Sequence, residues 1–377
     1  MEFIDLKAQY AALSERIDQR IRAVLDHGGY IIGPEVKELE GALAAYCRAP
    51  HAVTCANGTD ALVLALKALG VGQGDAVITS PFTFFATAEA AALVGARVLF
   101  ADVDADTFNL DPAALERAIA AGKAEIGDQL KAVIAVDLFG LPADYRRIEP
   151  ICREHGLALI ADAAQSFGGE LDGRRTGTFG DVTTTSFFPA KPLGCYGDGG
   201  ALFTANAELA DLLRSLRVHG KGSDKYDNVR IGTNSRLDTI QAAILIEKLA
   251  AFPDELVRRQ DVARRYDEAL RDVIATPTVP DGFLSSWAQY SVLATSGDER
   301  ARLMAELGQA GVPTTIYYAK PLHLQTALAG LGYRAGDFPV AEDLSSRVFS
   351  LPMSPYLAAA DQDRVIAAVR SAYRAAA

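Results

Sequence analysis

The 377-residue sequence has few of the features that mark metal-binding, secreted or membrane proteins. Its four cysteines (Cys47, Cys55, Cys152 and Cys195) form no C-x-x-C pair and have no histidines at zinc spacing. Neither a disulfide framework nor a metal site is therefore expected. No apolar run approaches the roughly 18 to 20 residues that span a bilayer, and the acidic start is unlike a signal peptide. We expect a reduced, soluble, cytoplasmic protein with no membrane partner.

Basic residues are also in the minority: 37 Lys and Arg against 48 Asp and Glu give a formal net charge of -11. Nucleic-acid-binding proteins normally have a basic surface, so no nucleic acid partner is expected. The sequence also lacks G-x-x-x-x-G-K-[ST]. Gly72-Gln73-Gly74 has Val77 where the dinucleotide fingerprint requires a third glycine, and it precedes a strand. A dinucleotide-dependent oxidoreductase is therefore disfavoured.

The first two-thirds of the chain alternates short apolar runs with helical patterns. The apolar runs predict strands at 51–56, 76–78, 97–103, 132–136 and 157–161. The helical patterns predict helices at 34–46, 61–69, 86–94, 112–121 and 145–154. Strands that are apolar on both faces and separated by helices indicate an α/β fold with a mostly parallel sheet covered on both sides.

The pattern changes twice further along the chain. Two predicted strands, 183–188 and 201–204, flank a glycine-rich turn with no long helix between them. After about residue 250 the composition shifts to a charged helix at 256–270 and to strands at 288–294 and 314–318. We expect a large domain over residues 1–250 and a smaller α+β domain over residues 251–377 that closes over it.

Polar residues follow three of the predicted strands at their carboxyl ends, where open α/β sheets bind ligands. The backbone N–H groups of Gly58 and Thr59, at a helix start, suit a phosphate. Asp162 ends the most apolar strand and would need a cationic partner to stay charged. Lys191, among apolar residues, prolines and glycines, would have a lowered pKa and could act as a nucleophilic amine. Pyridoxal phosphate requires these three features: an anchored phosphate, an acid facing its ring nitrogen and an amine for its aldehyde.

Each feature also has an ordinary interpretation when it is taken alone. Asn57-Gly58 is a common turn dipeptide, Asp162 could cap a helix, and Lys191 could be a solvated lysine. The prediction depends on the order in which the three occur, at successive strand ends.

Five segments carry a resemblance to a known family: Gly33–Val36, Cys55–Leu62, Ala161–Gly168, Ser186–Gly200 and Asn234–Asp238. Through them the chain resembles the DegT/DnrJ/EryC1/StrS sugar-nucleotide aminotransferases, which are fold-type I pyridoxal-phosphate enzymes. The resemblance extends from Phe3 to Met353. It implies that residues 1–250 form the cofactor-binding domain, with a mostly parallel central sheet flanked by helices.

The resemblance implies a role at the cofactor for eight residues. Lys191 forms the Schiff base, Asp162 faces the pyridinium nitrogen, Gln165 lies near the phenolic oxygen and Phe84 stacks on the ring. Gly58, Thr59 and Ser186 bind the phosphate, and Asn234 reaches it from the other subunit. The last role implies a homodimer with shared active sites.

The implied reaction transfers the amino group of L-glutamate, which leaves as 2-oxoglutarate, to a nucleotide-linked keto sugar. The best match is C3 of a UDP-2-acetamido-2-deoxy-3-oxo-glucose or -glucuronate. Arg236 could bind a carboxylate or diphosphate, or could form a structural salt bridge. Tyr317 stands where a histidine is expected in the glucuronate enzymes, which weakens the case for a C6 carboxylate. Tyr317 and Tyr318 are expected to contact substrate, with core packing as the alternative.

Other activities stay open at this point. A 4-keto-6-deoxy sugar 4-aminotransferase acting on a dTDP-, UDP- or GDP-linked sugar is one. A non-catalytic regulator of the same fold is another, although it would need no base. The related sugar dehydratases have histidine in place of the lysine, so Lys191 disfavours that activity.

Overall fold

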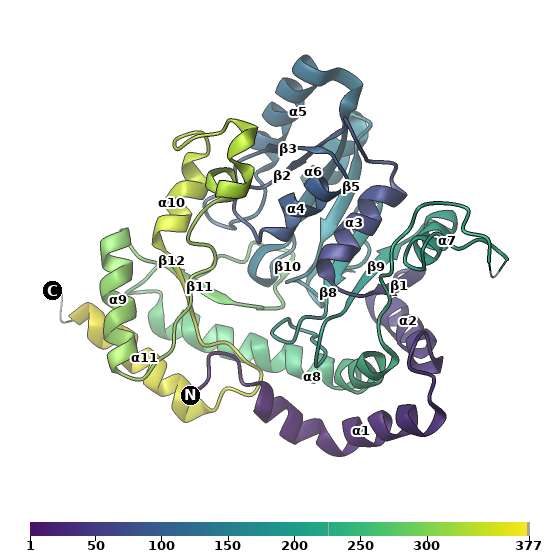
Figure 1. The fold of residues 1–377 in the computed structure, drawn as a ribbon. Coiled ribbons are helices and arrows are strands. Elements are labelled where there is room, and N and C mark those ends of the chain that lie inside the picture. The colour runs from purple at the N-terminus through teal and green to yellow at the C-terminus, as the bar shows by residue number, and fades with distance from the viewer. Residues whose placement is uncertain (225, 375–377) are drawn as a thin grey trace.

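A seven-stranded sheet forms the centre of the computed structural model, which describes residues 1–224 and 226–374 (Figure 1). Its strand order is β1-β9-β8-β5-β4-β2-β3. The strands are β1 (His51–Cys55), β2 (Ala76–Thr79), β3 (Arg97–Phe100), β4 (Leu130–Val136), β5 (Ala158–Asp162), β8 (Val182–Ser186) and β9 (Gly200–Thr204). Neighbouring strands from β8 to β3 pair in parallel, and only β9 runs antiparallel to its neighbours β1 and β8. The predicted α/β class with a mostly parallel sheet is confirmed.

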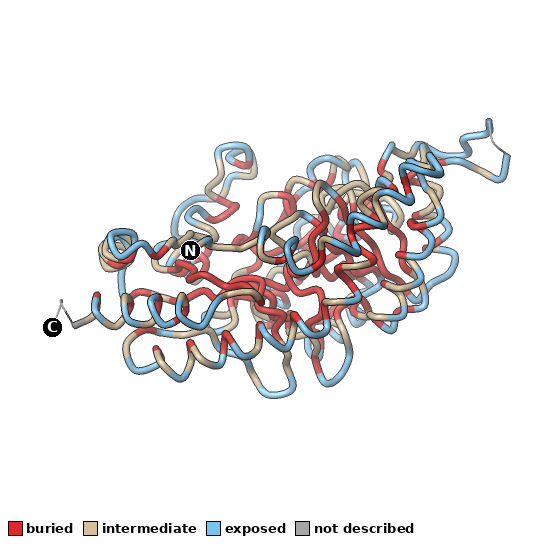
Figure 2. The backbone as a smooth tube through the Cα atoms, turned by 90° about the horizontal axis from the view of Figure 1, so that it is seen from below, coloured by how far each residue is buried: buried red, intermediate tan, exposed pale blue. Residues whose placement is uncertain are grey.

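Helices cover both faces of this sheet: α2 (Pro34–Cys47), α3 (Gly58–Ala68), α4 (Ala86–Leu93), α5 (Pro112–Ile126), α6 (Tyr145–Glu154) and α7 (Ala207–Leu216). Alternate residues of β4 enter two different cores, as the two-residue period of a strand requires. Ile134 packs in the core that includes α3, α4 and α7, and Val133 packs in the core that includes α5 and α6. Figure 2 shows the buried backbone running through the middle of the molecule, with exposed segments around it.

The predicted elements of this region are present with small changes in their ends. The helix predicted from residue 61 begins at Gly58 because Asn57 caps it, its side chain accepting a hydrogen bond from the Asp60 amide at 2.8 Å. The strand predicted over 97–103 ends at Phe100, and Val103 forms only an isolated bridge. Short elements fill the connections: η1 (Gly127–Gln129), η2 (Leu138–Gly140), β6 (Glu170–Leu171) and β7 (Arg174–Arg175).

The charged helix predicted at 256–270 is the second half of a much longer one. Helix α8 (Thr239–Leu270) has 32 residues and packs along α2 and along α1 (Leu6–His27). The predicted division between residues 250 and 251 falls inside α8, so the chain crosses it without leaving the helix. The division into two domains stays a prediction.

The elements that follow α8 in the chain are β10 (Phe283–Leu284), β11 (Tyr290–Leu293), α9 (Gly297–Gln309), η3 (Leu322–Leu324), η4 (Thr326–Leu331), α10 (Pro339–Arg347), β12 (Val348–Leu351) and α11 (Ala359–Arg374). Of these, α9, α11, β11 and β12 lie together (Figure 1), whereas β10 pairs with β6, and η3 and η4 pack on the core that includes α3 and α4. β11 and β12 form an antiparallel pair, and the core around them contains Tyr266, Phe349 and Val365. No helix among the described residues is both long enough and apolar enough to cross a membrane.

The prediction of a strand at 314–318 is wrong. Only Thr315 pairs, in an isolated bridge with Ser350. The next residues leave the edge of β12 because their side chains pack elsewhere: the Tyr318 ring meets Phe82 edge-on at 6.3 Å between centroids, and the Tyr317 ring lies 6.4 Å from that of Phe3.

Candidate active site

A cavity of about 650 Å³ opens at the carboxyl ends of β1, β4, β5 and β8. Its volume is typical of sites for small molecules. Nine of the eleven residues predicted for the site line it: Gly58, Thr59, Phe84, Asp162, Gln165, Ser186, Lys191, Tyr317 and Tyr318. The other two, Asn234 and Arg236, do not.

The register of the sheet brings the two parts of the expected phosphate site together. Gly200 of β9 pairs with the last residue of β1 on one side and with the last residue of β8, Ser186, on the other. Gly58, three residues beyond β1, therefore lies against Ser186. A Cβ atom added to Gly58 would stand 2.7 Å from the Ser186 Cβ, so this close approach requires glycine.

This corner offers hydrogen-bond donors to an anion. The first N–H groups of an α-helix have no partner within the helix, and those of Gly58 and Thr59 begin α3 beside the cavity. The Ser186 hydroxyl oxygen accepts a hydrogen bond from the Phe188 amide at 3.2 Å, which leaves the hydroxyl proton to donate. Two amides at a helix start and one hydroxyl fit a phosphate group.

Asp162 is the last residue of β5 and lies between β4 and β8. Only 6% of it is exposed, and its Oδ1 atom accepts a hydrogen bond from the Ala164 amide at 3.1 Å. Burial raises the pKa of the Asp162 carboxyl, while the Ala164 amide, the Lys191 charge and the Thr87 hydroxyl act to lower it. A cation placed against this carboxylate would therefore be strongly favoured.

Lys191 stands in the turn between β8 and β9, and its side chain lines the same cavity. The turn is held by the Lys191 amide, which donates to the Phe188 carbonyl at 2.9 Å. It is closed at Gly194, where a Cβ atom would lie 2.5 Å from the Pro189 carbonyl oxygen. Burial lowers the pKa of the Lys191 ammonium, and the Asp162 carboxylate opposes this. The amine loses its proton more readily than a solvated lysine, as a nucleophile requires.

Gln165 has both ends of its side-chain amide fixed. Its Oε1 atom accepts from the Phe139 amide at 2.8 Å, and its Nε2 atom donates to the Tyr318 hydroxyl at 3.0 Å. The Tyr318 hydroxyl therefore acts as an acceptor toward Gln165 and keeps its own proton for another partner. Burial raises the pKa of the Tyr318 phenol, so it stays neutral.

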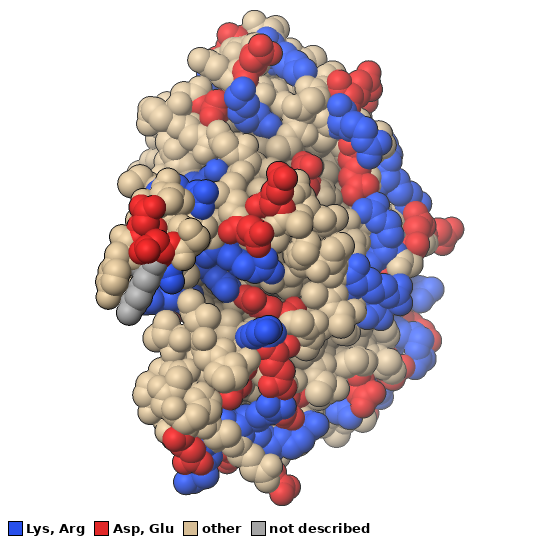
Figure 3. Space-filling view, turned by 90° about the vertical axis from the view of Figure 1, so that its right-hand side faces the viewer, with Lys and Arg blue, Asp and Glu red and all other residues tan. Residues whose placement is uncertain are grey.

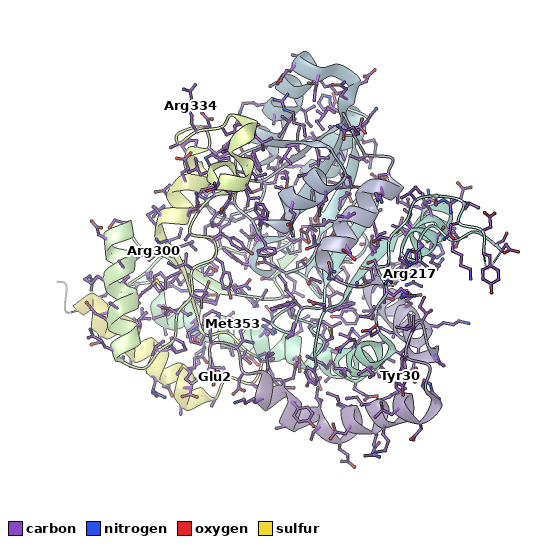
Figure 4. The ribbon with its side chains drawn as sticks, viewed as in Figure 1. Glu2, Tyr30, Arg217, Arg300, Arg334 and Met353 are labelled. Carbon is purple, nitrogen blue, oxygen red and sulfur yellow. The ribbon has the colours of Figure 1, made fainter. Side chains whose placement is uncertain are left out.

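Asn234 and Arg236 lie on a segment at the outer edge of the molecule. Asn234 is exposed and pairs with Val218 in an isolated bridge at the end of α7. The segment is anchored through the Ser235 amide, which donates at 2.9 Å to the carbonyl of Arg217, a buried residue labelled in Figure 4. The Arg236 side chain makes no hydrogen bond or ion pair with any other residue that the structure describes, so the structural salt bridge considered for it is absent there.

One residue that the sequence analysis missed supports the floor of the cavity. Asp137 follows β4 directly and is fully buried. Its carboxylate accepts hydrogen bonds from the hydroxyls of Ser166 (2.5 Å) and Tyr145 (2.7 Å) and from the Ala143 amide (2.8 Å). Through Ser166 it holds the turn that begins at Asp162. A polar residue at the end of an apolar strand was a visible signal, the same one that singled out Asp162.

Ionising the Asp137 carboxyl costs free energy because the group is buried. Burial raises its pKa to about 7, and the nearby Asp162 acts in the same direction, while its three hydrogen-bond donors act to lower it. The folded protein therefore holds this proton more tightly than the unfolded chain does. Between about pH 4 and pH 7 the stability that depends on this group falls as the pH rises.

The cavity fits pyridoxal phosphate. The Gly58–Ser186 corner matches its phosphate, Asp162 its ring nitrogen, and Lys191 its aldehyde. Fold and site together define a pyridoxal-phosphate-dependent transferase of fold type I.

The chain belongs to the DegT/DnrJ/EryC1/StrS aminotransferase family, and its residues 11–370 match the sequence pattern of that family. Pyridoxal phosphate is the cofactor of this family, so the predicted family, cofactor and enzyme class are confirmed.

Three similar proteins illustrate the relationship. The chain is 47% identical over 370 residues (98% of this chain and 99% of the other) to a UDP-2-acetamido-2-deoxy-3-oxo-D-glucuronate aminotransferase of Pseudomonas aeruginosa. It is 40% identical over 372 residues (97% and 96%) to a UDP-N-acetyl-3-dehydro-alpha-D-glucosamine 3-aminotransferase of Acidithiobacillus ferrooxidans. The crystal structure of a DegT DnrJ EryC1 StrS aminotransferase from Brucella abortus superposes with a TM-score of 0.96, at 54% identity and 99% coverage of both chains.

Replacing Asp162 with Asn tests its role at the ring nitrogen. We expect Asp162→Asn to retain cofactor but to lose at least about 100-fold in transamination rate, because a neutral amide no longer favours the protonated ring. Cofactor content is measured by absorbance and the rate by steady-state assay. The control is Asp267→Asn, which changes a partly buried aspartate outside the cavity and should leave the rate near that of the wild type. Near-normal turnover of Asp162→Asn would show that the assignment is wrong.

Replacing Asp137 with Asn removes its titration while keeping its shape. As the pH is raised from 5 to about 7.5, we expect the wild type to lose several degrees of melting temperature relative to Asp137→Asn, because only the wild type must ionise a buried carboxyl. The two melting curves are recorded side by side at each pH. A difference in melting temperature that does not change with pH would contradict the pKa inferred for Asp137.

Proposed function

We propose that the enzyme transfers the amino group of L-glutamate to C3 of a UDP-linked 2-acetamido-2-deoxy-3-oxo sugar, in the glucose or the glucuronate form. The observation that carries the proposal is the convergence of an anion site, a buried carboxylate and a desolvated amine in one cavity at the sheet edge. The sugar is inferred from the Pseudomonas and Acidithiobacillus relatives, whose names both specify a 3-oxo UDP sugar.

Each residue of the cavity has a defined part in this reaction. Bound pyridoxal phosphate supplies an aldehyde that condenses with amines and a ring that takes up electrons when a C–H bond breaks. Asp162 would keep a proton on the ring nitrogen, and the Gly58–Ser186 corner would hold the phosphate. The Nζ atom of Lys191 would hold the aldehyde in the absence of substrate. When a substrate amine is bound there instead, Nζ would be a free base within reach of the proton on the amino carbon.

The reaction runs in two halves that use the same groups. In the first half glutamate gives up its amino group and leaves as 2-oxoglutarate. In the second half the keto sugar receives that nitrogen. Tyr317 and Tyr318 stand at the wall of the cavity beside Phe84 and provide an aromatic surface with two hydroxyls for the sugar.

The charges around the cavity indicate that a further cation is needed. Its lining contains three acids (Asp60, Asp162 and Asp198) and, among the residues described, a single basic residue, Lys191. Glutamate brings two carboxylates and the nucleotide a diphosphate, all of which are stabilised by guanidinium groups. Arg236 is not at the cavity of its own chain, so we propose that the partner subunit supplies it together with Asn234.

A homodimer is supported by the surface around the Asn234–Asp238 segment. Tyr30, Ile31 and Ile32 are about half exposed there, and they are tied to the start of α8 by the Thr239 amide, which donates to the Tyr30 carbonyl. In the loop that follows α7, Ile231 is 87% exposed. Figure 3 shows this side of the molecule, with basic and acidic side chains interleaved and uncharged areas between them. Large apolar side chains exposed in this way are typical of a surface that is covered by a partner.

The C6 substituent of the sugar is the least constrained part of the proposal. Tyr317 is half-buried at the cavity wall, and burial raises the pKa of its phenol, so it presents a neutral hydroxyl. A neutral hydroxyl suits a C6 hydroxyl as well as a carboxylate. We therefore expect the 3-oxo-glucosamine sugar to be accepted along with the glucuronate.

The substrate is tested with purified enzyme, glutamate and a panel of 3-keto and 4-keto nucleotide sugars. We expect 2-oxoglutarate to form with the 3-oxo UDP sugars, and the Lys191→Ala variant to be at least about 1000-fold slower because it lacks the base. The variant should also lose the visible absorbance that glutamate shifts in the wild type. Faster turnover of 4-keto-6-deoxy sugars would favour a 4-aminotransferase, and a wild type that takes up no cofactor would refute an enzymatic function.

Shared active sites are tested by mixing two inactive variants. Lys191→Ala and Asn234→Ala subunits, unfolded and refolded together in equal amounts, should recover about a quarter of wild-type activity, because half of the dimers then contain one intact site. The activity of each variant refolded alone is the control. If the mixture shows only the average of the two separate variants, Asn234 acts within its own subunit or has no role at the site.

A further inference from the structure

Gln289 is a buried polar residue at the cavity wall that has no assigned role. It lies one residue before β11, is 7% exposed and lines the cavity. Its Oε1 atom is buried without a hydrogen-bond partner. No other residue that the structure describes forms a hydrogen bond with this side-chain amide.

The backbone around Gln289 is held in place from several sides. The Gln289 amide donates to the Phe139 carbonyl at 3.3 Å, and the Ser286 amide donates to the Gly140 carbonyl at 2.8 Å. The Ser286 hydroxyl donates to the backbone carbonyl of Gln165 at 3.0 Å. A Cβ atom on Gly140 would lie 2.5 Å from the Trp287 nitrogen, so this contact is close. Gln289 is therefore presented to the cavity by a fixed segment.

Gln165 and Gln289 both form hydrogen bonds with the backbone of Phe139. Gln165 accepts a hydrogen bond from the nitrogen of Phe139, and Gln289 donates its backbone N–H to the carbonyl oxygen of Phe139. The side-chain amide of Gln165 has a partner at each end, whereas the Oε1 atom of Gln289 is buried without one. A buried polar atom without a partner destabilises a protein. A ligand in the cavity that donates a hydrogen bond to the Gln289 Oε1 atom would supply the missing partner.

The chemistry of the unpartnered atom restricts the ligand. The cofactor groups that need partners are already matched by Gly58, Thr59, Ser186, Asp162, Gln165 and Lys191. The carboxylates of glutamate carry no hydrogen at neutral pH and cannot donate to an amide oxygen. A sugar offers donors of the right kind, in its hydroxyl groups and in the N–H of an acetamido group.

From these contacts we propose that Gln289 positions the keto sugar by accepting a hydrogen bond from one of its hydroxyl or acetamido groups. This inference rests on the proposed function and extends it to a specific contact. The proposed hydrogen bond to Oε1 is made in the second half of the reaction, which separates its effect from that of residues that act on the cofactor.

The test measures the two half-reactions of the holoenzyme separately, by following the cofactor spectrum in single turnovers. In Gln289→Met, which keeps the size of the side chain, we expect the glutamate half-reaction to stay within about twofold of the wild type. The keto-sugar half-reaction should lose about 10- to 100-fold in kcat/KM, as expected when one hydrogen bond to a substrate is removed. Gln289→Glu retains an acceptor oxygen and should recover part of the loss.

The matched control is Gln260→Met. Gln260 contacts the same segment, donating to the Ser285 carbonyl and accepting from the Trp287 indole, but is not part of the cavity lining. The Gln260→Met variant should leave the ratio of the two half-reaction rates as in the wild type. Equal slowing of both half-reactions in Gln289→Met, or no effect on either, would overturn the inference alone. A wild-type enzyme that aminates none of the keto sugars would instead overturn the proposed function, and this inference with it.

Discussion

The amine of Lys191 and the carboxylate of Asp162 share one desolvated cavity, and burial acts on them in opposite directions. It lowers the pKa of the amine and raises that of the acid, so each group is pushed toward its neutral form, while their mutual attraction pushes both back. A cationic ring nitrogen beside Asp162 would satisfy the acid and leave the amine free to react. The chemistry of the enzyme depends on this balance, because a solvated lysine would stay protonated and a solvated aspartate would bind the ring weakly.

The sheet provides the geometry that this balance needs. Parallel strands deliver the ends of β4, β5 and β8 to one edge, and the antiparallel strand β9 joins β1 to the same edge through Gly200. Behind this edge, Asp137 anchors the turn that carries Asp162 and Gln165. The cavity is therefore assembled from the ends of strands that are fixed by a buried core. Because these strands are rigid, the reacting side chains are held in place.

Much of this site was predictable because its signals are local. Asp162 ends an apolar strand, Lys191 lies in a turn rich in prolines and glycines, and Gly58 begins a helix shortly after a strand. Other features depend on contacts between distant segments. The sequence around Tyr317 and Tyr318 predicted a strand, whereas these side chains pack against Phe3 and Phe82. Gln289 gains its significance from lining the same cavity as Asp162 and Lys191, which are distant from it in the sequence. Asn234 and Arg236 were assigned by resemblance, and their own chain does not bring them to the cavity.

The 32-residue span of α8 has a practical consequence for anyone who wishes to divide this protein. A fragment that stopped at residue 250 would end in the middle of a continuous helix. It would lose the second half of α8, whose buried residues Val262, Tyr266 and Leu270 belong to the core beneath β11 and β12. Each piece would then display an apolar surface to water and tend to aggregate. Gene fragments for separate expression, and insertion points for fused reporters, are better chosen in the exposed connections outside this helix.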